Sequence, residues 1–386
     1  MKILYLAPRY HTNQTAIMRG LKKNGDEVKF ISYYTAPIED YTDIQPIVLG
    51  FSGWYQAFYH LYAEVIHKNR REAMNNKITY GYPPTRRLKK EILDFHPDVA
   101  ILRDRTIYTM KAYRICRENR IPCILYNQNP LWDDLPKTDI FHKYVYRHTP
   151  AVRITPVLGH PNETGKSVQK GSYYVPFVVE PGCPPEKRSY YADGTIRIFC
   201  IGKFEPRKHH LMLMRAVKKL RSKTGRPLTL TVIGEASGHL QKEYYRTVEN
   251  TLHEEKMEAF VTLRANVSRE GVRELYLATD LFVMPSTLEM ASVSQLEAMS
   301  YSIPVICSDT NGTACYTQDG YNGYQFRYCD EDDLYDKLEK ITRDPGAMKE
   351  MGANAYQSVL DSHTFEGYRK KIEKILKDNF GLDYSR

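Results

Sequence analysis

The feature that most constrains this chain is a repeated order of short apolar segments and amphipathic helical segments. Residues 2–7 form an apolar run, a helical pattern follows, and a second apolar run covers 28–32. The same order returns at 98–102, in a helical pattern through Ile115, and at 121–126. Because strands that alternate with helices favour parallel sheets with crossover helices, the first half is predicted to be a Rossmann-like unit.

The second half repeats this order after a cluster of prolines and glycines between residues 176 and 195, which predicts an interdomain linker. The strands predicted after it are 196–201, 228–233, 281–284 and 304–307, and the helical patterns between them cover 209–222, 239–254, 270–278 and 293–300. The fold class is therefore α/β, with two doubly wound domains and the cleft between them as the default ligand site.

The length of 386 residues also favours two domains, because it exceeds what one compact core usually holds. We predict an N-terminal domain over 1–185 and a C-terminal domain over 190–364. A last amphipathic helix over 365–380 carries an apolar face that needs a surface to cover. No G-x-G-x-x-G opens a helix after the first strand of either domain, which argues against a dinucleotide-dependent dehydrogenase.

The formal charge of +9 favours an anionic partner: nucleic acid, a phosphorylated substrate or an anionic membrane. The chain lacks a helix-turn-helix signature, a metal-ligand spacing and a ribonucleoprotein aromatic motif, so a phosphorylated substrate or a lipid is preferred over nucleic acid.

No apolar run approaches the ~18 residues that span a bilayer, and the N-terminal run is too short for a signal peptide, so a cytoplasmic location is expected. The seven scattered cysteines suggest buried free thiols.

A basic turn, Gly202-Lys203-Phe204-Glu205-Pro206-Arg207-Lys208, joins a predicted strand to a predicted helix. Positive side chains at a helix N-terminus fail to complement the helix dipole, and a bound anion such as a diphosphate would remove that conflict. A solvated basic surface turn explains this segment equally well on its own.

Two glutamates follow the strand at 281–284. Ser292 and Gln295 have the spacing of a capping box, which places Glu289 in the loop and Glu297 in the second turn of the helix. Two carboxylates suit the hydroxyls of a hexose and a ribose, while the helix N-terminus between them suits phosphate. Either glutamate alone is explained as well by dipole compensation or solvation, but the pair together with the basic turn favours a binding site.

The basic turn, the Glu289 and Glu297 pair, Ile303-Pro304-Val305-Ile306 and Asp319-Gly320-Tyr321-Asn322-Gly323 resemble family 4 of the retaining GT-B glycosyltransferases. The resemblance covers residues 196–330 well and the N-terminal half only by pattern. It implies an NDP-sugar donor held mainly by the C-terminal domain, metal-independent transfer with retention, and no cofactor beyond this substrate. It also implies that the final segment, 365–386, packs on the N-terminal domain.

Carried over by position, Lys203 and Lys208 would hold the diphosphate, Glu289 the sugar hydroxyls and Glu297 the ribose. The resemblance assigns catalysis to Lys203, Lys208 and Glu289. Further donor contacts would come from Gly202, Arg207, Asn266, Val267, Met290, Ala291 and Ser292. The chain departs from the family where Lys203 replaces an arginine and Ser292 a glycine. The lysine keeps the charge but loses the bidentate fork of arginine.

The acceptor side is implied less specifically. A glycine-rich loop of the family is replaced by His11-Thr12-Asn13-Gln14-Thr15, and a common histidine by Gln128, which alternatively is a turn residue before Pro130. Arg103 and Asp104 follow the strand at 98–102, where they could bind an anionic acceptor or pair with one another. The acceptor itself could be a glycan, a lipid-linked sugar or a small molecule.

An apolar stripe at helical spacing (Trp54, Phe58, Leu61, Tyr62 and Val65) precedes two basic clusters, at 68–71 and 86–90. Most such stripes face a core. The alternative is a surface that docks on the inner face of an anionic membrane to reach a lipid-linked acceptor.

The predicted function is that of a hexosyltransferase that moves a sugar by front-face attack. The leaving diphosphate would help to deprotonate the acceptor, and no side chain is assigned as a covalent nucleophile. Two alternatives remain open: a GT-B nucleotide-sugar epimerase, and a sugar-nucleotide-binding protein without activity.

Overall fold

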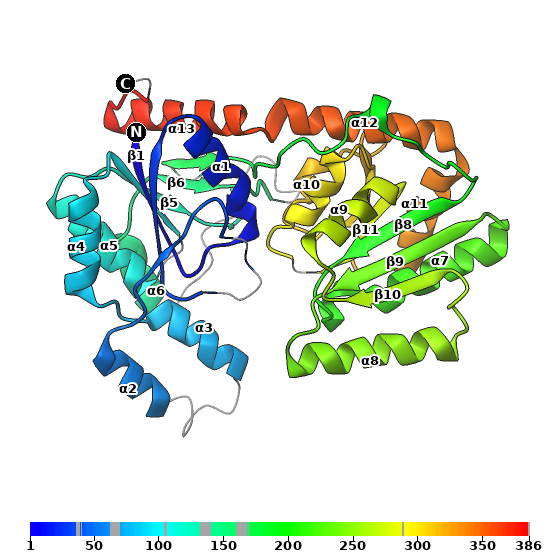
Figure 1. Ribbon diagram of the computed structural model, residues 1–386, viewed down its shortest axis with the longest axis horizontal. Helices are drawn as coiled ribbons and strands as arrows, with labels where there is room; N and C mark the ends of the chain where they lie inside the picture. The colour runs from blue at the N-terminus through cyan, green and yellow to red at the C-terminus, as the bar shows by residue number, and fades with distance from the viewer. Residues whose placement is uncertain are drawn as a thin grey trace. The chain divides into compact units, whose positions relative to one another are not determined.

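The computed structural model covers residues 1–386 and describes all of them except 36–38, 40, 62–69, 104–105, 132–139, 160–167, 169, 288 and 385–386. The chain forms two compact units (Figure 1). Unit 1 contains Met1–Pro156, Gly165–Val178 and Tyr368–Arg386, and unit 2 contains Val157–Thr164 and Val179–Gly367. The chain enters the main part of unit 2 at Val179, inside the segment that was predicted to be a linker.

Unit 1 is built on a parallel sheet with the strand order β3-β2-β1-β4-β5-β6-β7. Its strands are β1 (Lys2–Ala7), β2 (Glu27–Ser32), β3 (Ile47–Val48), β4 (Val99–Arg103), β5 (Cys123–Tyr126), β6 (Arg153–Thr155) and β7 (Ser172–Tyr174). The central strands β1 and β4 are almost entirely buried, as expected when helices cover both faces of a parallel sheet. The Rossmann-like prediction for this half is confirmed.

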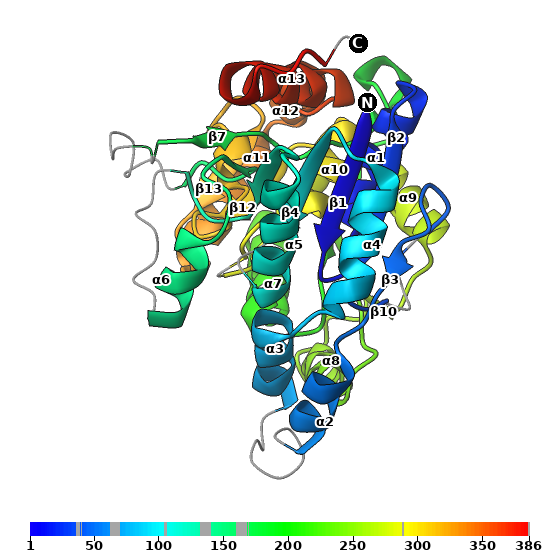
Figure 2. The ribbon, with the colours of Figure 1, turned by 90° about the vertical axis from the view of Figure 1, so that its left-hand side faces the viewer.

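The helices of unit 1 are η1 (Thr12–Gln14), α1 (Thr15–Lys23), α2 (Gly53–Leu61), α3 (Arg70–Tyr80), α4 (Thr85–Phe95), α5 (Ile107–Glu118), α6 (Ile140–Arg147) and α13 (Phe365–Phe380). Figure 2 shows α3, α4 and α5 covering one face of this unit. The apolar face of α13 is buried, and the hydroxyls of Tyr5 and Tyr368 are hydrogen-bonded at 2.9 Å. Tyr384 then donates to Asp26 at 2.9 Å, so the end of the chain is held against the beginning of unit 1.

Unit 2 contains a second parallel sheet, with the order β10-β9-β8-β11-β12-β13. Its strands are β8 (Ile196–Ile201), β9 (Leu228–Gly234), β10 (Val261–Ala265), β11 (Leu281–Met284), β12 (Val305–Ser308) and β13 (Gly323–Phe326). Its helices are η4 (Pro185–Lys187), η5 (Pro206–Lys208), α7 (His210–Thr224), α8 (His239–Glu254), α9 (Arg269–Ala278), α10 (Val293–Ser300), η6 (Ala314–Tyr316), α11 (Glu331–Arg343) and α12 (Pro345–Ser362).

The strand order of each sheet reverses at one point, and this position locates the ligand edge. In unit 1 the reversal lies between β1 and β4, and in unit 2 it lies between β8 and β11. Open α/β sheets bind ligands outside the carboxyl ends of the strands at such a reversal. The loops after β8 and β11 are the basic turn and the loop of Glu289, so both predicted donor segments reach the same edge.

Five cysteines are buried and free, as predicted, whereas Cys315 is half-buried and Cys329 is exposed. Within the described parts of the chain, no helix is both long and apolar enough to cross a membrane.

Candidate donor-sugar site

The basic turn after β8 folds back on itself. Pro206 begins the short helix η5, and His209 then adopts a left-handed backbone with φ of 49°, which redirects the chain into α7. The aliphatic part of Lys208 crosses over Gly202, where a Cβ atom would lie 3.2 Å from its Cδ. Lys208 is buried as a result. Its ammonium group is thereby held at the switch point of the sheet.

A carboxylate from the next loop meets two of the cations of this turn. Oε2 of Glu289 accepts a hydrogen bond from Nη1 of Arg207 at 2.8 Å and another from Nζ of Lys208. Nε of Arg207 also donates to Glu205 at 2.8 Å. The backbone N–H of Thr287 donates to the carbonyl of Arg207 at 2.9 Å, which joins the two loops. The structure therefore assembles Arg207, Lys208 and Glu289, which we call the ion cluster.

The ion cluster sets the ionisation of Glu289. Burial alone would raise the pKa of this carboxyl, but the charges and hydrogen bonds of Lys208 and Arg207 outweigh burial, and the pKa is lowered. Glu289 is therefore a carboxylate at neutral pH. A depressed folded-state pKa contributes stability above the unfolded-state value of about 4.3, and this contribution is lost as the pH falls through the folded-state value.

This linkage gives a prediction for unfolding. The difference in free energy of unfolding between the wild type and Glu289→Gln should be constant from about pH 5 upward and should shrink below about pH 4. Urea unfolding of both proteins between pH 3 and pH 7 measures it. A difference that grows towards acid would contradict the lowered pKa.

Lys203 is paired with a residue outside the ion cluster. Its Nζ is paired with Oε2 of Glu235 at 3.1 Å, at the end of β9, and its side chain is 43% exposed. The sequence paired Lys203 with Lys208 as the two diphosphate cations, but the structure instead places Arg207 beside Lys208. The reason is the turn of η5, which directs Arg207 and Lys208 towards the same carboxylate.

The loop that carries Glu289 is held by a glycine that the sequence analysis did not single out. The N–H of Gly312 donates to the carbonyl of Glu289 at 2.8 Å, and a Cβ atom on Gly312 would lie 1.8 Å from the carbonyl oxygen of Met290. The side chain of Met290 is exposed, Ala291 is half-buried, and Ser292 is buried with its N–H donating to Thr313. Only glycine fits this approach, so the loop position depends on Gly312.

The predicted capping box is wrong. Ser292 is the N-cap of α10, but its side chain makes no cap hydrogen bond to the described residues. Gln295 is fully buried, and its Oε1 accepts from Asn311 at 2.9 Å and from Thr313 at 2.9 Å. Its Nε2 donates to the hydroxyl of Thr317 at 2.8 Å. The side chain of Gln295 therefore belongs to this long-range hydrogen-bond network and does not cap α10.

This network predicts a large effect on stability. Gln295→Leu keeps the volume but leaves the amide of Asn311 without its acceptor and the hydroxyl of Thr317 without its donor, so the free energy of unfolding should fall by about 3 kcal/mol. Urea unfolding measures the loss. Gln357→Leu, on an exposed face of α12, is the matched control and should change the value by less than about 0.5 kcal/mol. Equal effects of the two changes would contradict the role given to the network.

Glu297 lies on α10 and is half-buried beside α9. Tyr276 donates its hydroxyl to Oε2 of Glu297 at 3.0 Å and contacts the carbonyl of Ser294 at 3.2 Å. Burial raises the pKa of Glu297, and the hydrogen bond from Tyr276 partly opposes this rise. The two glutamates that were predicted to line one rim therefore have different partners. Glu289 joins the ion cluster, whereas Glu297 is held by Tyr276, which the sequence analysis did not identify.

The loop after β10 contains Asn266 and Val267, which the resemblance placed at the nucleotide base. Asn266 has a left-handed backbone with φ of 55°, and its Oδ1 accepts from the N–H of Ala236 at 3.0 Å. The side chain therefore joins the ends of β9 and β10. Val267 is half-buried beside Gly271, where a Cβ atom would lie 2.8 Å from the valine Cγ1.

The acceptor-side candidates of unit 1 follow strands at its own switch point. His11 and Asn13 lie after β1, where His11 contacts Arg9 at 3.0 Å. Asn13 is buried, and its Oδ1 has no hydrogen-bond partner among the described residues. Arg103 ends β4 with its guanidinium over the ring of Tyr126 at 4.7 Å. These residues share an edge of the sheet, but His11 and Asn13 make no hydrogen bond to Arg103 among the described residues.

Two further residues were predicted on the acceptor side, Asp104 and Gln128. Asp104 lies outside the described residues. Gln128 is half-buried in a turn that its neighbours build, in which the N–H of Asn129 donates to Oδ1 of Asn127 at 3.0 Å. The side chain of Gln128 makes no hydrogen bond to the described residues, so it is not needed to form this turn.

Comparison with known proteins identifies the second unit. Residues 186–358 match the family of glycosyl transferases group 1. The matched residues lie within unit 2, which is therefore similar to the group 1 glycosyltransferases. The resemblance predicted from residues 196–330 is therefore confirmed, and it rests on the unit that contains the ion cluster.

Curated relatives match part of the chain. The D-inositol 3-phosphate glycosyltransferase of Nocardia farcinica is 27% identical over 194 residues, which are 49% of this chain and 43% of that protein. A UDP-Gal:alpha-D-GlcNAc-diphosphoundecaprenol alpha-1,3-galactosyltransferase of Escherichia coli is 27% identical over 107 residues, 28% of this chain and 27% of that protein. The chain thus spans less than half the length of these curated relatives.

Solved structures match nearly the whole chain. A glycosyltransferase from Rickettsia africae has a TM-score of 0.72 at 15% identity, with 99% of both chains covered. Anabaena HepE, in a complex with UDP-glucose, has a TM-score of 0.69 at 13% identity, with 98% of this chain and 100% of that chain covered. These matches show the fold alone. The fold of the chain is GT-B, as predicted.

Proposed function

We propose that the chain is a retaining glycosyltransferase that moves a sugar from an NDP-sugar to an acceptor hydroxyl. The observation that carries the proposal is the ion cluster at the switch point of unit 2, where two cations and one carboxylate converge. A diphosphate needs such positive charge, and a sugar needs a carboxylate that accepts from its hydroxyls.

The geometry of Glu289 supports a role in sugar binding. Arg207 and Lys208 both contact Oε2, while Oε1 accepts no hydrogen bond from the described residues. Oε1 is thus the oxygen proposed to accept hydroxyls of the donor sugar. Glu297, already oriented by Tyr276, is proposed to bind the ribose of the nucleotide.

The proposed chemistry needs positive charge where the leaving group develops negative charge. Lys208 and Arg207 would stabilise the departing diphosphate, together with the backbone N–H groups at the N-termini of α7 and α10. The diphosphate would take the proton of the acceptor hydroxyl as that oxygen attacks the anomeric carbon from the same face. The proposal involves no metal ion and no cofactor beyond the sugar nucleotide, and Lys203 is left as a peripheral contact.

The acceptor is proposed to carry phosphate. The names of two relatives specify an inositol phosphate and a lipid diphosphate, and this chain has a formal charge of +9. Arg103 and the buried amide of Asn13 lie at the switch point of unit 1, where they would bind such an acceptor. A lipid-linked acceptor implies a cytoplasmic protein in peripheral contact with an anionic membrane.

Release of nucleoside diphosphate tests the proposal. UDP-sugars are the first donors to try because HepE is named with UDP-glucose, followed by GDP-, ADP- and dTDP-sugars. Release that depends on a phosphorylated acceptor supports transfer. An isomerised donor sugar without acceptor, or binding without turnover, would overturn it in favour of an epimerase or a binding protein.

A further inference from the structure

Four helices of unit 1 carry an excess of positive charge. The helices α3, α4, α5 and α6 contain twelve lysines and arginines but only four acidic residues, an excess of eight against a formal net charge of +9 for the whole chain. Figure 2 shows α3, α4 and α5 on the face of unit 1 that is turned to the viewer, with α2 and α6 at its edges. We call this surface the basic face.

Large apolar side chains are exposed on the two helices at the edges of the basic face. Trp54, Phe58 and Leu61 recur along α2 at helical spacing and are 61%, 59% and 59% exposed. Ile140 and Tyr144, one turn apart on α6, are 87% and 51% exposed. The core-facing interpretation of the α2 stripe is therefore wrong for these three residues, and Tyr55 is the α2 side chain that is buried.

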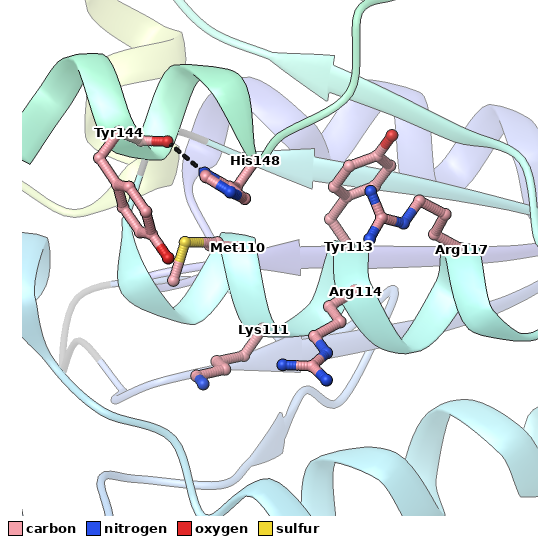
Figure 3. Close-up of a pocket in the computed structure, with 7 residues that line it drawn as sticks. All are labelled: Met110, Lys111, Tyr113, Arg114, Arg117, Tyr144 and His148. Atoms are coloured by element: carbon pink, nitrogen blue, oxygen red, sulfur yellow. Dashed lines mark hydrogen bonds between the residues drawn. The ribbon is translucent and has the colours of Figure 1, made fainter.

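A pocket of about 90 Å³ lies between α5 and α6 on the basic face. Figure 3 shows the side chains that line it, which are Met110, Lys111, Tyr113, Arg114, Arg117, Tyr144 and His148. Three of them are lysine and arginine side chains from successive turns of α5. The volume exceeds that needed for one water molecule several-fold, which is room for a phosphate group.

The contacts of the pocket leave it with a net positive charge. Arg114 donates from Nε to Oε1 of Glu118 at 2.8 Å, and this carboxylate is the one acidic group of α5. Nζ of Lys111 lies 5.0 Å from the ring centre of Tyr82. Nδ1 of His148 donates to the carbonyl of Tyr144 at 2.7 Å, as drawn in Figure 3. Three cations against one carboxylate make an anion the complementary ligand.

We propose that the basic face docks on an anionic lipid surface and that the pocket between α5 and α6 binds the phosphate of a lipid headgroup. Charge complementarity selects the surface, because clustered lysines and arginines are attracted to anionic lipids. Exposed tryptophan and tyrosine suit the membrane interface, and the aliphatic Leu61 and Ile140 suit its acyl boundary. Single-stranded RNA would use the cations and the rings, but it would leave these aliphatic side chains in water.

The inference rests on the proposed function, because membrane docking would bring a lipid-linked acceptor to the enzyme. Binding of the basic face to lipid does not itself depend on the donor site. Two readouts separate the two ideas. Vesicle co-sedimentation reports on the basic face, and the thermal shift caused by UDP reports on the ion cluster in unit 2.

The test uses the full chain with vesicles of phosphatidylglycerol and phosphatidylcholine, and with vesicles of phosphatidylcholine alone. We expect binding to the anionic vesicles that falls steeply with salt, and little binding to the neutral ones. The triple change Lys111→Gln, Arg114→Gln and Arg117→Gln should weaken the partition coefficient by about 100-fold. Trp54→Ser with Phe58→Ser should weaken it while keeping the salt dependence.

The matched control removes three exposed cations of unit 2 with Lys223→Gln, Lys242→Gln and Arg246→Gln, and should reduce binding less than tenfold. Both triple variants should keep the wild-type unfolding temperature, which shows that they fold, and the wild-type thermal shift with UDP. Equal losses in the two triple variants would overturn the proposal, as would equal binding to neutral vesicles. Binding of inorganic phosphate without vesicle binding, or tighter binding to single-stranded RNA than to anionic vesicles, would also overturn it.

Discussion

Lys208→Ala is expected to lower kcat/KM for the NDP-sugar by more than ~100-fold, the scale of losing one donor that acts on charge developed in the transition state. Lys208 is buried, its stem packs over Gly202, and its ammonium contacts Glu289. The cation is therefore held in place before the donor binds. Initial rates of nucleotide release at varied donor concentration measure the effect.

Two further variants separate the charge of Lys208 from its packing. Lys208→Met keeps an apolar stem over Gly202 and removes only the charge, so it should lose as much activity as the alanine variant although the packing over Gly202 is kept. Lys219→Ala, whose partner is the exposed Asp332, should leave kcat/KM unchanged. Near-wild-type turnover by Lys208→Met would contradict the assigned role.

The alternation of strands and helices could be predicted because each element carries its own local pattern. The helix bounds 239–254, 293–300 and 365–380 agree with α8, α10 and α13. The sequence analysis did not identify β10, β13, α11 or α12. The strand order is non-local, and it was therefore learned from the structure.

The donor segments could be recognised, but their contacts could not. Arg207 and Glu289 are 82 residues apart, and they meet because β8 and β11 are neighbours in the sheet. Long-range contacts also explain why Gln295 does not form the predicted capping box, because its side chain bonds to Asn311 and Thr313. The local capping rule failed there because residues of another loop supplied the hydrogen bonds.

The α2 stripe shows a second limit of sequence patterns. Helical spacing shows that Trp54, Phe58 and Leu61 share a face, but it does not show whether that face is covered. In the structure the interior beside α2 is filled by Tyr55 and Phe51, whose rings lie 5.8 Å apart. The volume near the core is therefore already occupied, and the stripe is left at the surface.

Glu289→Gln is the second change with a large expected effect. The amide keeps the size of the side chain and one acceptor oxygen, but it removes the charge that faces Arg207 and Lys208. We expect kcat/KM for the NDP-sugar to fall by about 100-fold, because the sugar loses its charged acceptor and the two cations lose their common partner. Steady-state kinetics with the best donor measures the change.

Binding of the nucleotide alone should respond in the opposite direction. Without the Glu289 carboxylate, Lys208 loses its anionic partner and Arg207 keeps only Glu205, so the diphosphate of UDP supplies the missing negative charge. The thermal shift caused by UDP should therefore be at least as large in Glu289→Gln as in the wild type, although turnover falls.

Glu205→Gln is the matched control, because it removes a partner of Arg207 and leaves the contact between Lys208 and Glu289 in place. It should lose less than tenfold in kcat/KM. A Glu289→Gln protein that loses UDP binding and turnover together would show that the carboxylate organises the whole site and does not act chiefly on the sugar.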